Sequence, residues 1–276
     1  MSKLYVVATP IGNLSDITLR AIDVLKEVDL VAAEDTRHSG ALLAHLGIDT
    51  PMQSYHDRNE DTSAEQIVDK IRAGISVALI SDAGTPLISD PGYRLVCRAL
   101  EEGIAVVPIP GVSAVIAALS VSGLPTNRFA FEGFLPARQA ARRELLRKLR
   151  FEARTLVFFE APHRVVSVIQ DMAMILGGDR RVSLGRELTK KFEQVWNGTL
   201  DAASDSLDSD VIPARGEFVI VVEPASELSE DFDPRMLMEI LLAEFPPRKA
   251  ADVASQITGR SKKSLYDVAL TLKKKS

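Results

Sequence analysis

The chain has 276 residues and a formal net charge of −5, and 46% of its residues are hydrophobic and 26% charged. This globular composition excludes a wholly disordered chain and a collagen-like repeat. The single cysteine, Cys97, excludes an intramolecular disulfide and a cysteine-rich zinc site. No apolar run reaches the roughly 18–20 residues that span a bilayer, and residues 1–7 lack the layout of a secretion signal, so we expect a cytoplasmic protein.

Basic residues gather in two segments of this acidic chain. Residues 137–154 carry a local net charge of +5 and residues 246–276 carry +6, so the remainder is strongly acidic. A local basic surface can bind a polyanion, although a basic helix is more often only a solvated face. Because there are two such segments, we give the two interpretations equal weight.

Short apolar strands alternate with helices in the first part of the chain. The pattern predicts strands over 4–8, 29–33, 75–80 and 104–109 and helices over 19–26, 40–46, 64–73, 93–102 and 112–121. Such alternation is typical of a mainly parallel sheet that helices cover on both faces. Turn-forming residues at 123–127 indicate a boundary, so we predict an N-terminal α/β domain over residues 1–122.

A second α/β pattern predicts another domain over residues 123–225. Strands are expected over 128–134, 154–159, 182–186, 193–196 and 218–223, and helices over 140–149 and 162–176. The last two strands lack long helices after them in this prediction, so we expect a mixed parallel and antiparallel sheet. An acidic stretch, 225–234, suits a linker.

The last residues, 235–276, are predicted to form a small unit of three helices over 236–245, 248–258 and 262–272. The spacing resembles a helix-turn-helix, and Lys262 and Lys263 open its last helix, as in a nucleic-acid reader. A small docking unit is the alternative interpretation.

Three loops at 8–16, 81–92 and 108–114 each follow a predicted strand. Ligands of open α/β sheets bind outside the carboxyl ends of the strands, so we expect these loops to share a site. The first loop has neither the dinucleotide fingerprint nor the ending of a phosphate-binding loop. Ser113 and Ala114 keep the start of a helix small and offer it amide donors for an anion or carboxylate.

Polar clusters follow other strands, at 33–38 and 56–60, where they are candidates for orienting a substrate or removing a proton. Similar clusters at 160–164 and 185–191 are expected to form the opposite wall of an interdomain cleft.

Several short motifs, in order along the chain, resemble those of the tetrapyrrole methylase superfamily: Pro10-Ile11-Gly12-Asn13-Leu14, Ala33-Glu34-Asp35-Thr36-Arg37, Ser81-Asp82-Ala83-Gly84-Thr85-Pro86, Asp90-Pro91-Gly92 and Pro110-Gly111 with Ser113-Ala114. Two further motifs resemble one branch, which methylates small-subunit ribosomal RNA: Phe131-Glu132-Gly133-Phe134-Leu135-Pro136 and Arg186-Glu187-Leu188-Thr189-Lys190. The resemblance covers nearly the whole chain.

The resemblance implies S-adenosylmethionine-dependent 2′-O-methylation of a cytidine in small-subunit (16S) rRNA. It implies a bilobed α/β fold with the donor in the cleft between the lobes, a homodimer, and no metal. The donor-binding residues that it implies are Pro10, Ile11, Gly12, Gly84, Thr85, Pro86, Ile88, Gly111, Ser113 and Ala114, with Phe159 and Phe218 beside the adenine. Superfamily members often carry an acidic residue where Thr85 stands, which leaves the role of Asp82 open.

A ribose 2′-hydroxyl is a poor nucleophile at neutral pH, so a base or a cation beside it would help the reaction. Candidate bases are Glu34, Asp35 and His56, and candidate cations are Arg37, Lys190 and Lys191. From these we select Asp35, Arg37 and Lys190 as catalytic candidates. The RNA-binding candidates are Arg138, Arg142, Arg143, Arg147, Lys262 and Lys263.

Two alternatives remain from the sequence. One is methylation of a small tetrapyrrole on the same scaffold, although a macrocycle needs neither basic segment. The other is a nucleic-acid-binding regulator that uses its terminal helices and senses a ligand with its α/β part.

Overall fold

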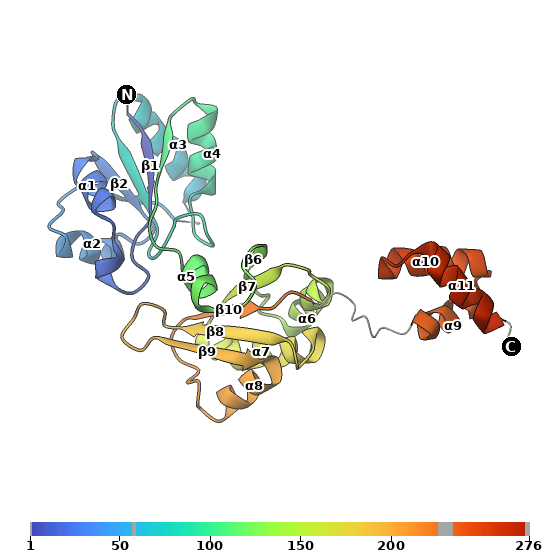
Figure 1. Ribbon diagram of the computed structural model, residues 1–276. Helices are drawn as coiled ribbons and strands as arrows, with labels where there is room; N and C mark the ends of the chain where they lie inside the picture. The colour runs from blue at the N-terminus through green and yellow to red at the C-terminus, as the bar shows by residue number, and fades with distance from the viewer. Residues whose placement is uncertain (1, 57–58, 226–233, 274–276) are drawn as a thin grey trace. The chain divides into compact units, whose positions relative to one another are not determined.

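The computed structural model describes residues 2–56, 59–225 and 234–273. The chain divides after Ala225 into two compact units, of which the first holds two five-stranded sheets and the second is helical (Figure 1). Most of the predicted linker at 225–234 lies outside the described residues, as do Asp57, Arg58, Lys274 and Lys275. The predicted boundary after residue 122 stays a prediction, because the first unit continues through both sheets.

The first sheet consists of five parallel strands in the order β3-β2-β4-β1-β5. Its strands are β1 (Leu4–Val7), β2 (Leu30–Ala33), β3 (Met52–Ser54), β4 (Val77–Ile80) and β5 (Val106–Ile109). The sequence pattern predicted all of them except β3, a three-residue edge strand whose side chains are only half-buried. A strand this short has too few residues to show an alternating pattern.

Helices cover both faces of this sheet: α1 (Leu19–Glu27), α2 (Thr36–His45), α3 (Glu60–Arg72) and α4 (Tyr93–Glu101). Successive side chains of a strand point to opposite faces. Leu30 and Ala32 accordingly pack with α3 and α4, whereas Val31 packs with α1 and α2 on the other face. Figure 1 shows these two pairs of helices on opposite sides of the sheet. The helix α2 begins four residues earlier than predicted, because the Asp35 carboxylate caps it by accepting from the Arg37 backbone N–H at 2.8 Å.

The second sheet mixes parallel and antiparallel pairs, as predicted. Its order is β6-β7-β10-β8-β9, in which β6 and β7 are parallel and the other pairs antiparallel. The strands are β6 (Phe129–Phe134), β7 (Thr155–Glu160), β8 (Arg181–Arg186), β9 (Gln194–Thr199) and β10 (Phe218–Val222).

The helix α8 (Leu200–Asp208), which directly follows β9, was not predicted. The expectation that no long helix follows this strand is therefore wrong. Thr199 caps the helix, and Leu200, Ala203 and Leu207 are buried at helical spacing. The intervening Asp and Ser residues lower its helix propensity and hide this short apolar face.

The two faces of the second sheet pack against different helices. On one face lie α6 (Gln139–Leu149), α7 (Pro162–Leu176) and α8, around a core that includes Leu146, Val168 and Phe158. On the other face lies α5 (Ala114–Val121), whose Leu119 packs in a cluster with Val219. The helix α5, which ends the predicted first domain, thus packs on the second sheet. The loop between β5 and α5 therefore connects the two sheets.

The second unit contains α9 (Pro234–Glu244), α10 (Pro247–Thr258) and α11 (Lys262–Lys273), as the sequence predicted. Its small core includes Met238, Ala250, Ala254, Leu265 and Ala269. Within the described ranges of the chain, no helix is both long and apolar enough to cross a membrane.

Candidate functional site

The three loops that follow β1, β4 and β5 meet at one edge of the first sheet. Thr9 and Gly84 pair their backbones, with N–H to O distances of 2.9 and 3.0 Å, which joins the first loop to the second. The Thr85 hydroxyl donates to the Val112 carbonyl at 3.0 Å, which joins the second loop to the third. The sequence placed these loops at one edge, and the hydrogen bonds confirm this.

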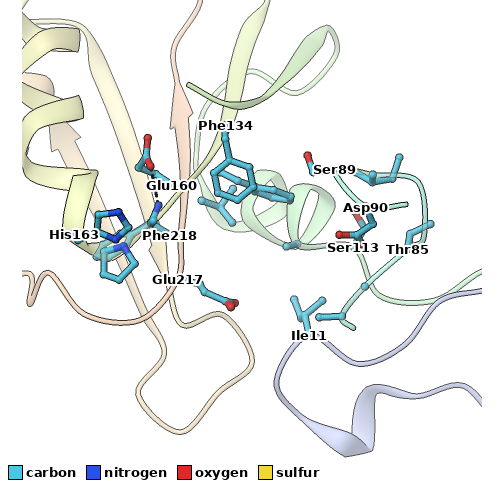
Figure 2. Close-up of a pocket in the computed structure, with 18 residues that line it drawn as sticks. Ile11, Thr85, Ser89, Asp90, Ser113, Phe134, Glu160, His163, Glu217 and Phe218 are labelled. Atoms are coloured by element: carbon cyan, nitrogen blue, oxygen red, sulfur yellow. Dashed lines mark hydrogen bonds between the residues drawn. The ribbon is translucent and has the colours of Figure 1, made fainter. Parts of the chain in front are cut away.

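A cavity of about 500 Å³ opens at this edge, between the loops and the second sheet (Figure 2). This volume is in the range of sites for small organic ligands. The residues that line it are Ile11, Ala83, Gly84, Thr85, Ile88, Ser89, Asp90, Ser113, Ala114, Phe134, Phe159, Glu160, Ala161, Pro162, His163, Glu217, Phe218 and Val219.

Partly buried polar contacts hold the second loop, residues 81–92, in place. One carboxylate oxygen of Glu60 accepts from the backbone N–H of Gly92 at 3.2 Å and from the Tyr55 hydroxyl at 3.0 Å. Leu87 and Ser89 have positive φ values of 74° and 66°, which residues other than glycine rarely adopt. Backbone strain of this kind persists where the surroundings impose it, and it is concentrated at functional sites.

The opposite wall of the cavity comes from β7 and the start of α7. Glu160 is buried, accepts from the Ala161 backbone N–H at 2.8 Å, and pairs with Arg164 at 3.1 Å. Burial raises the pKa of the Glu160 carboxyl, while the Ala161 hydrogen bond and the Arg164 charge lower it less. The prediction that residues 160–164 form an opposite wall is confirmed for 160–163, which line the cavity.

The stability of a Glu160→Gln variant should depend on pH differently from that of the wild type. A carboxyl with a raised pKa in the folded protein keeps its proton after the unfolded chain has lost it, so wild-type stability falls as pH rises. Between about pH 4 and about pH 7, the free energy of unfolding of the wild type should therefore fall relative to that of the variant. Urea denaturation at both pH values measures this difference, and a constant or opposite trend would contradict the raised pKa.

Six of the ten predicted donor-binding residues line the cavity: Ile11, Gly84, Thr85, Ile88, Ser113 and Ala114. Phe159 and Phe218, which were expected beside the adenine, line it as well. The other four predicted residues are not among the lining residues and instead shape the loops. Pro10 and Pro86 are buried, a Cβ on Gly111 would lie 3.0 Å from the Ala8 Cβ, and a Cβ on Gly12 would overlap the Lys190 side chain.

The three predicted catalytic residues are not among those that line the cavity. The Asp35 carboxylate caps α2 and pairs with Arg37 at 2.7 Å, and these bonds hold the pKa of Asp35 well below its usual range. A carboxylate with so low a pKa is a weak base. The Arg37 side chain is 91% exposed. The catalytic roles of Asp35 and Arg37 stay predictions that the geometry does not favour.

Lys190 does not line the cavity, but it contacts residues at the edge of the cavity. Its aliphatic chain packs over Gly12, next to the lining residue Ile11, and its amine lies 2.9 Å from the carboxylate of Glu217, which lines the cavity. A second carboxylate, that of Glu187, lies 3.0 Å away. Burial opposes the charge, but these two hydrogen bonds outweigh it and raise the pKa of the Lys190 amine.

Several lining residues were not singled out in the sequence, among them Phe134, Glu217 and Val219. Glu217 directly precedes the fully buried strand β10, a position that carries no local motif. Phe134 stands inside a family motif, but only its place at the cavity gives it a role. These residues are far in sequence from the loop motifs and reach the cavity only through strand pairing in the second sheet. The sequence alone therefore did not indicate them.

The basic residues of α6 differ in how accessible they are. The Arg142 side chain is only 5% exposed and pairs with the buried Asp171, with a nitrogen-to-oxygen distance of 2.6 Å. The guanidinium of Arg142 joins α6 to α7 inside the protein, so its predicted contact with RNA stays a prediction that the geometry does not favour. Arg143 also pairs with Asp171, at 2.7 Å, whereas Arg138 and Arg147 are exposed.

The second unit has a shallow hollow lined by Arg248, Lys262, Lys263 and Tyr266. Lys262 also pairs with Asp252 at 2.6 Å. Three cations around a half-exposed aromatic ring form a surface of the kind that contacts nucleic acid. In the part of the chain that the structure describes, no cluster of three or more His, Cys, Asp or Glu side chains could hold a metal ion.

Solved structures with the same fold include methyltransferases that act on tetrapyrroles. Uroporphyrin-III C-methyltransferase of Thermus thermophilus, solved with S-adenosylhomocysteine, has a TM-score of 0.54 at 21% identity, covering 80% of this chain and 97% of that one. Cobalt precorrin-4 methyltransferase has a TM-score of 0.58 at 18% identity, covering 80% and 94%. The sequence model of the Tetrapyrrole (Corrin/Porphyrin) Methylases matches residues 3–204. Fold and sequence thus define a methylase of the tetrapyrrole methylase class.

Curated relatives narrow this class. Ribosomal RNA small subunit methyltransferase I of Pseudomonas aeruginosa is 50% identical over 99% of this chain and 98% of its own length. The protein of the same name from Escherichia coli O157:H7 is 47% identical over 97% and 94%. A model named RsmI C-terminal HTH domain matches residues 230–273. The chain belongs to the ribosomal RNA small subunit methyltransferase I family.

The family confirms the resemblance, the fold class and the enzyme class that the motifs indicated. Its members are S-adenosylmethionine-dependent methyltransferases, so the predicted donor is confirmed at the level of the family.

Proposed function

We propose that this chain transfers the methyl group of S-adenosylmethionine to the ribose 2′-hydroxyl of a cytidine in small-subunit rRNA. The observation that carries the proposal is the near full-length similarity, at about half identity, to relatives named for methylation of small-subunit rRNA. The proposal includes the homodimer, which rests on the family resemblance, and the cytoplasmic location, which is the expectation from the sequence. The substrate is the rRNA, either free or in an assembled small subunit.

The cavity fits the proposed donor. Its walls are mainly apolar, with Ile11, Ile88 and Phe218 suited to the adenosine and the aliphatic chain. Ser113 and Ala114 open α5, where free backbone N–H groups suit a carboxylate such as that of the methionine part. A Cβ on Gly84 would lie 3.3 Å from the Ile11 Cγ2, so the glycine leaves room that a side chain would fill.

S-Adenosylmethionine supplies an electrophilic methyl group on a positively charged sulfur. The ribose 2′-oxygen forms the new C–O bond, the C–S bond breaks with its electron pair going to sulfur, and the 2′-hydroxyl proton passes to a base or to water. The displacement is in-line, so alignment of donor and acceptor contributes most of the catalysis. Lys190, paired with the lining residue Glu217, is the cation that we propose to act at this edge of the cavity.

The hollow on the second unit is the proposed RNA contact of that unit. Arg248→Glu with Lys263→Glu should weaken binding to small-subunit rRNA and make its salt dependence shallower, because fewer phosphate counterions are released. Filter binding at several salt concentrations measures both effects. Lys26→Glu on α1 is a control that changes an exposed charge in the first unit. Unchanged affinity and an unchanged salt slope would contradict the role of the hollow.

Transfer of labelled methyl from S-adenosylmethionine tests the reaction itself. Three acceptors are compared in parallel: small subunits that lack the modification, their naked rRNA, and uroporphyrinogen. We expect label in RNA and none in the tetrapyrrole. Label in the tetrapyrrole alone would overturn the proposal in favour of the small-macrocycle alternative.

A further inference from the structure

The lining residue Phe134 is exposed, although it stands at the end of a strand in the second sheet. The residue is 53% exposed, and Figure 2 shows its ring on the opposite side of the cavity from Ile11. Phe134 is also not one of the predicted donor-binding residues, most of which belong to the three loops of the first sheet. The ring therefore offers an aromatic face to a ligand that enters beside the donor.

A bulge in β6 turns the Phe134 ring toward the cavity. Phe131 pairs with Val157 and Gly133 pairs with Phe158, so Glu132 is an extra residue in the strand. Without it, Phe131 and Phe134 would point to opposite faces, because side chains alternate along a strand. With it, both rings meet Phe159, at centroid distances of 4.8 and 5.7 Å.

Gly133 makes this geometry possible. Its φ is +66°, in the left-handed region that a residue with a Cβ adopts only with strain. A Cβ there would also contact the Ser89 hydroxyl at 3.5 Å, on the second loop. The strand thus departs from regular pairing at a glycine next to the cavity, and the result is an exposed ring held edge-on by Phe159.

We propose that Phe134 is the stacking platform for the nucleobase of the nucleotide to be methylated. This inference rests on the proposed function. Nucleobases that leave a helical stack are commonly held on aromatic side chains, and a ring fixed by packing loses little freedom on binding. Because base and ribose are joined, stacking the base on Phe134 places the ribose in the same cavity as the donor.

The test uses the full-length protein and small subunits that lack the modification. Phe134→Ala should raise KM for the subunits about tenfold or more, because stacking of one base on an aromatic ring contributes about that factor or more. Calorimetric titration should show an unchanged Kd for S-adenosylmethionine. Phe134→Tyr keeps the aromatic face and should behave like the wild type.

Phe129→Ala is the matched control, since Phe129 is an exposed phenylalanine of the same strand that does not line the cavity. It should leave KM unchanged. An unchanged KM in Phe134→Ala would overturn the stacking role, and a Kd for the donor that rises in parallel with the loss of activity would assign the ring to the donor instead. If the wild type and Phe129→Ala methylate no RNA, the proposed function fails, and the stacking role fails with it.

Discussion

Gly84→Val should abolish binding of S-adenosylmethionine. Gly84 lines the cavity, and its Cβ would lie 3.3 Å from the Ile11 side chain, so the two methyl groups of a valine would extend into space that the donor needs. Its φ of +83° also disfavours a β-branched residue. A shift of the backbone to relieve this strain would disturb the paired hydrogen bonds with Thr9. Calorimetric titration should show no binding at donor concentrations that saturate the wild type.

Gly103→Val separates backbone strain from obstruction of the cavity. Gly103 has a similar φ of +70°, and a Cβ there would meet nothing within 4 Å. Both substitutions impose backbone strain of about 1–2 kcal/mol, but only the one at Gly84 fills the cavity. The control should therefore bind the donor normally, and wild-type affinity in a folded Gly84→Val protein would contradict the placement of the donor.

Arg142→Met should destabilise the protein by about 3–5 kcal/mol. The Arg142 guanidinium and Arg143 both bond to Asp171, whose side chain is only 2% exposed, and Gln139 donates to it at 3.3 Å. Removing Arg142 leaves a buried carboxylate with part of its charge uncompensated. Urea denaturation near neutral pH measures this loss of stability.

Arg147→Met, on the exposed side of α6, is the control and should change the free energy of unfolding by no more than about 0.5 kcal/mol. Equal stability of the two variants would show that the Asp171 network contributes little. Because a variant of Arg142 is expected to be less stable, a loss of RNA affinity in it would reflect unfolding. The exposed residues Arg138 and Arg147 are therefore the positions on α6 that test RNA contact.

Most of the fold could be predicted because its strands are buried and its helices are amphipathic. Strands such as β4 and β10 are apolar throughout, and α7 begins at Pro162 and ends at Leu176, as predicted. The edge strand β3 and the polar helix α8 carry too weak a pattern. The packing of α5 on the second sheet could not be predicted either, because its sequence is apolar on every side.

The site could be predicted on the side that consists of loops and not on the side that consists of strands. Ile11, Gly84 and Ser113 stand in short motifs that follow strands, and the rule for open α/β sheets brings such loops together. Phe134 and Glu217 reach the cavity through a bulge and through strand pairing, which no local motif reports. The burial of Arg142 could not be predicted, because a positive charge on a helix gives no sign of a buried partner 29 residues away.

The most direct test of the account is to locate the methyl group that the enzyme transfers. Small subunits lacking the modification are incubated with labelled S-adenosylmethionine and the wild type, Gly84→Val or Gly103→Val, and the rRNA is then digested to nucleosides. We predict label in 2′-O-methylcytidine with the wild type and with Gly103→Val, and none with Gly84→Val. Label on a base would contradict the proposed reaction. Full transfer by Gly84→Val would contradict the proposed donor site.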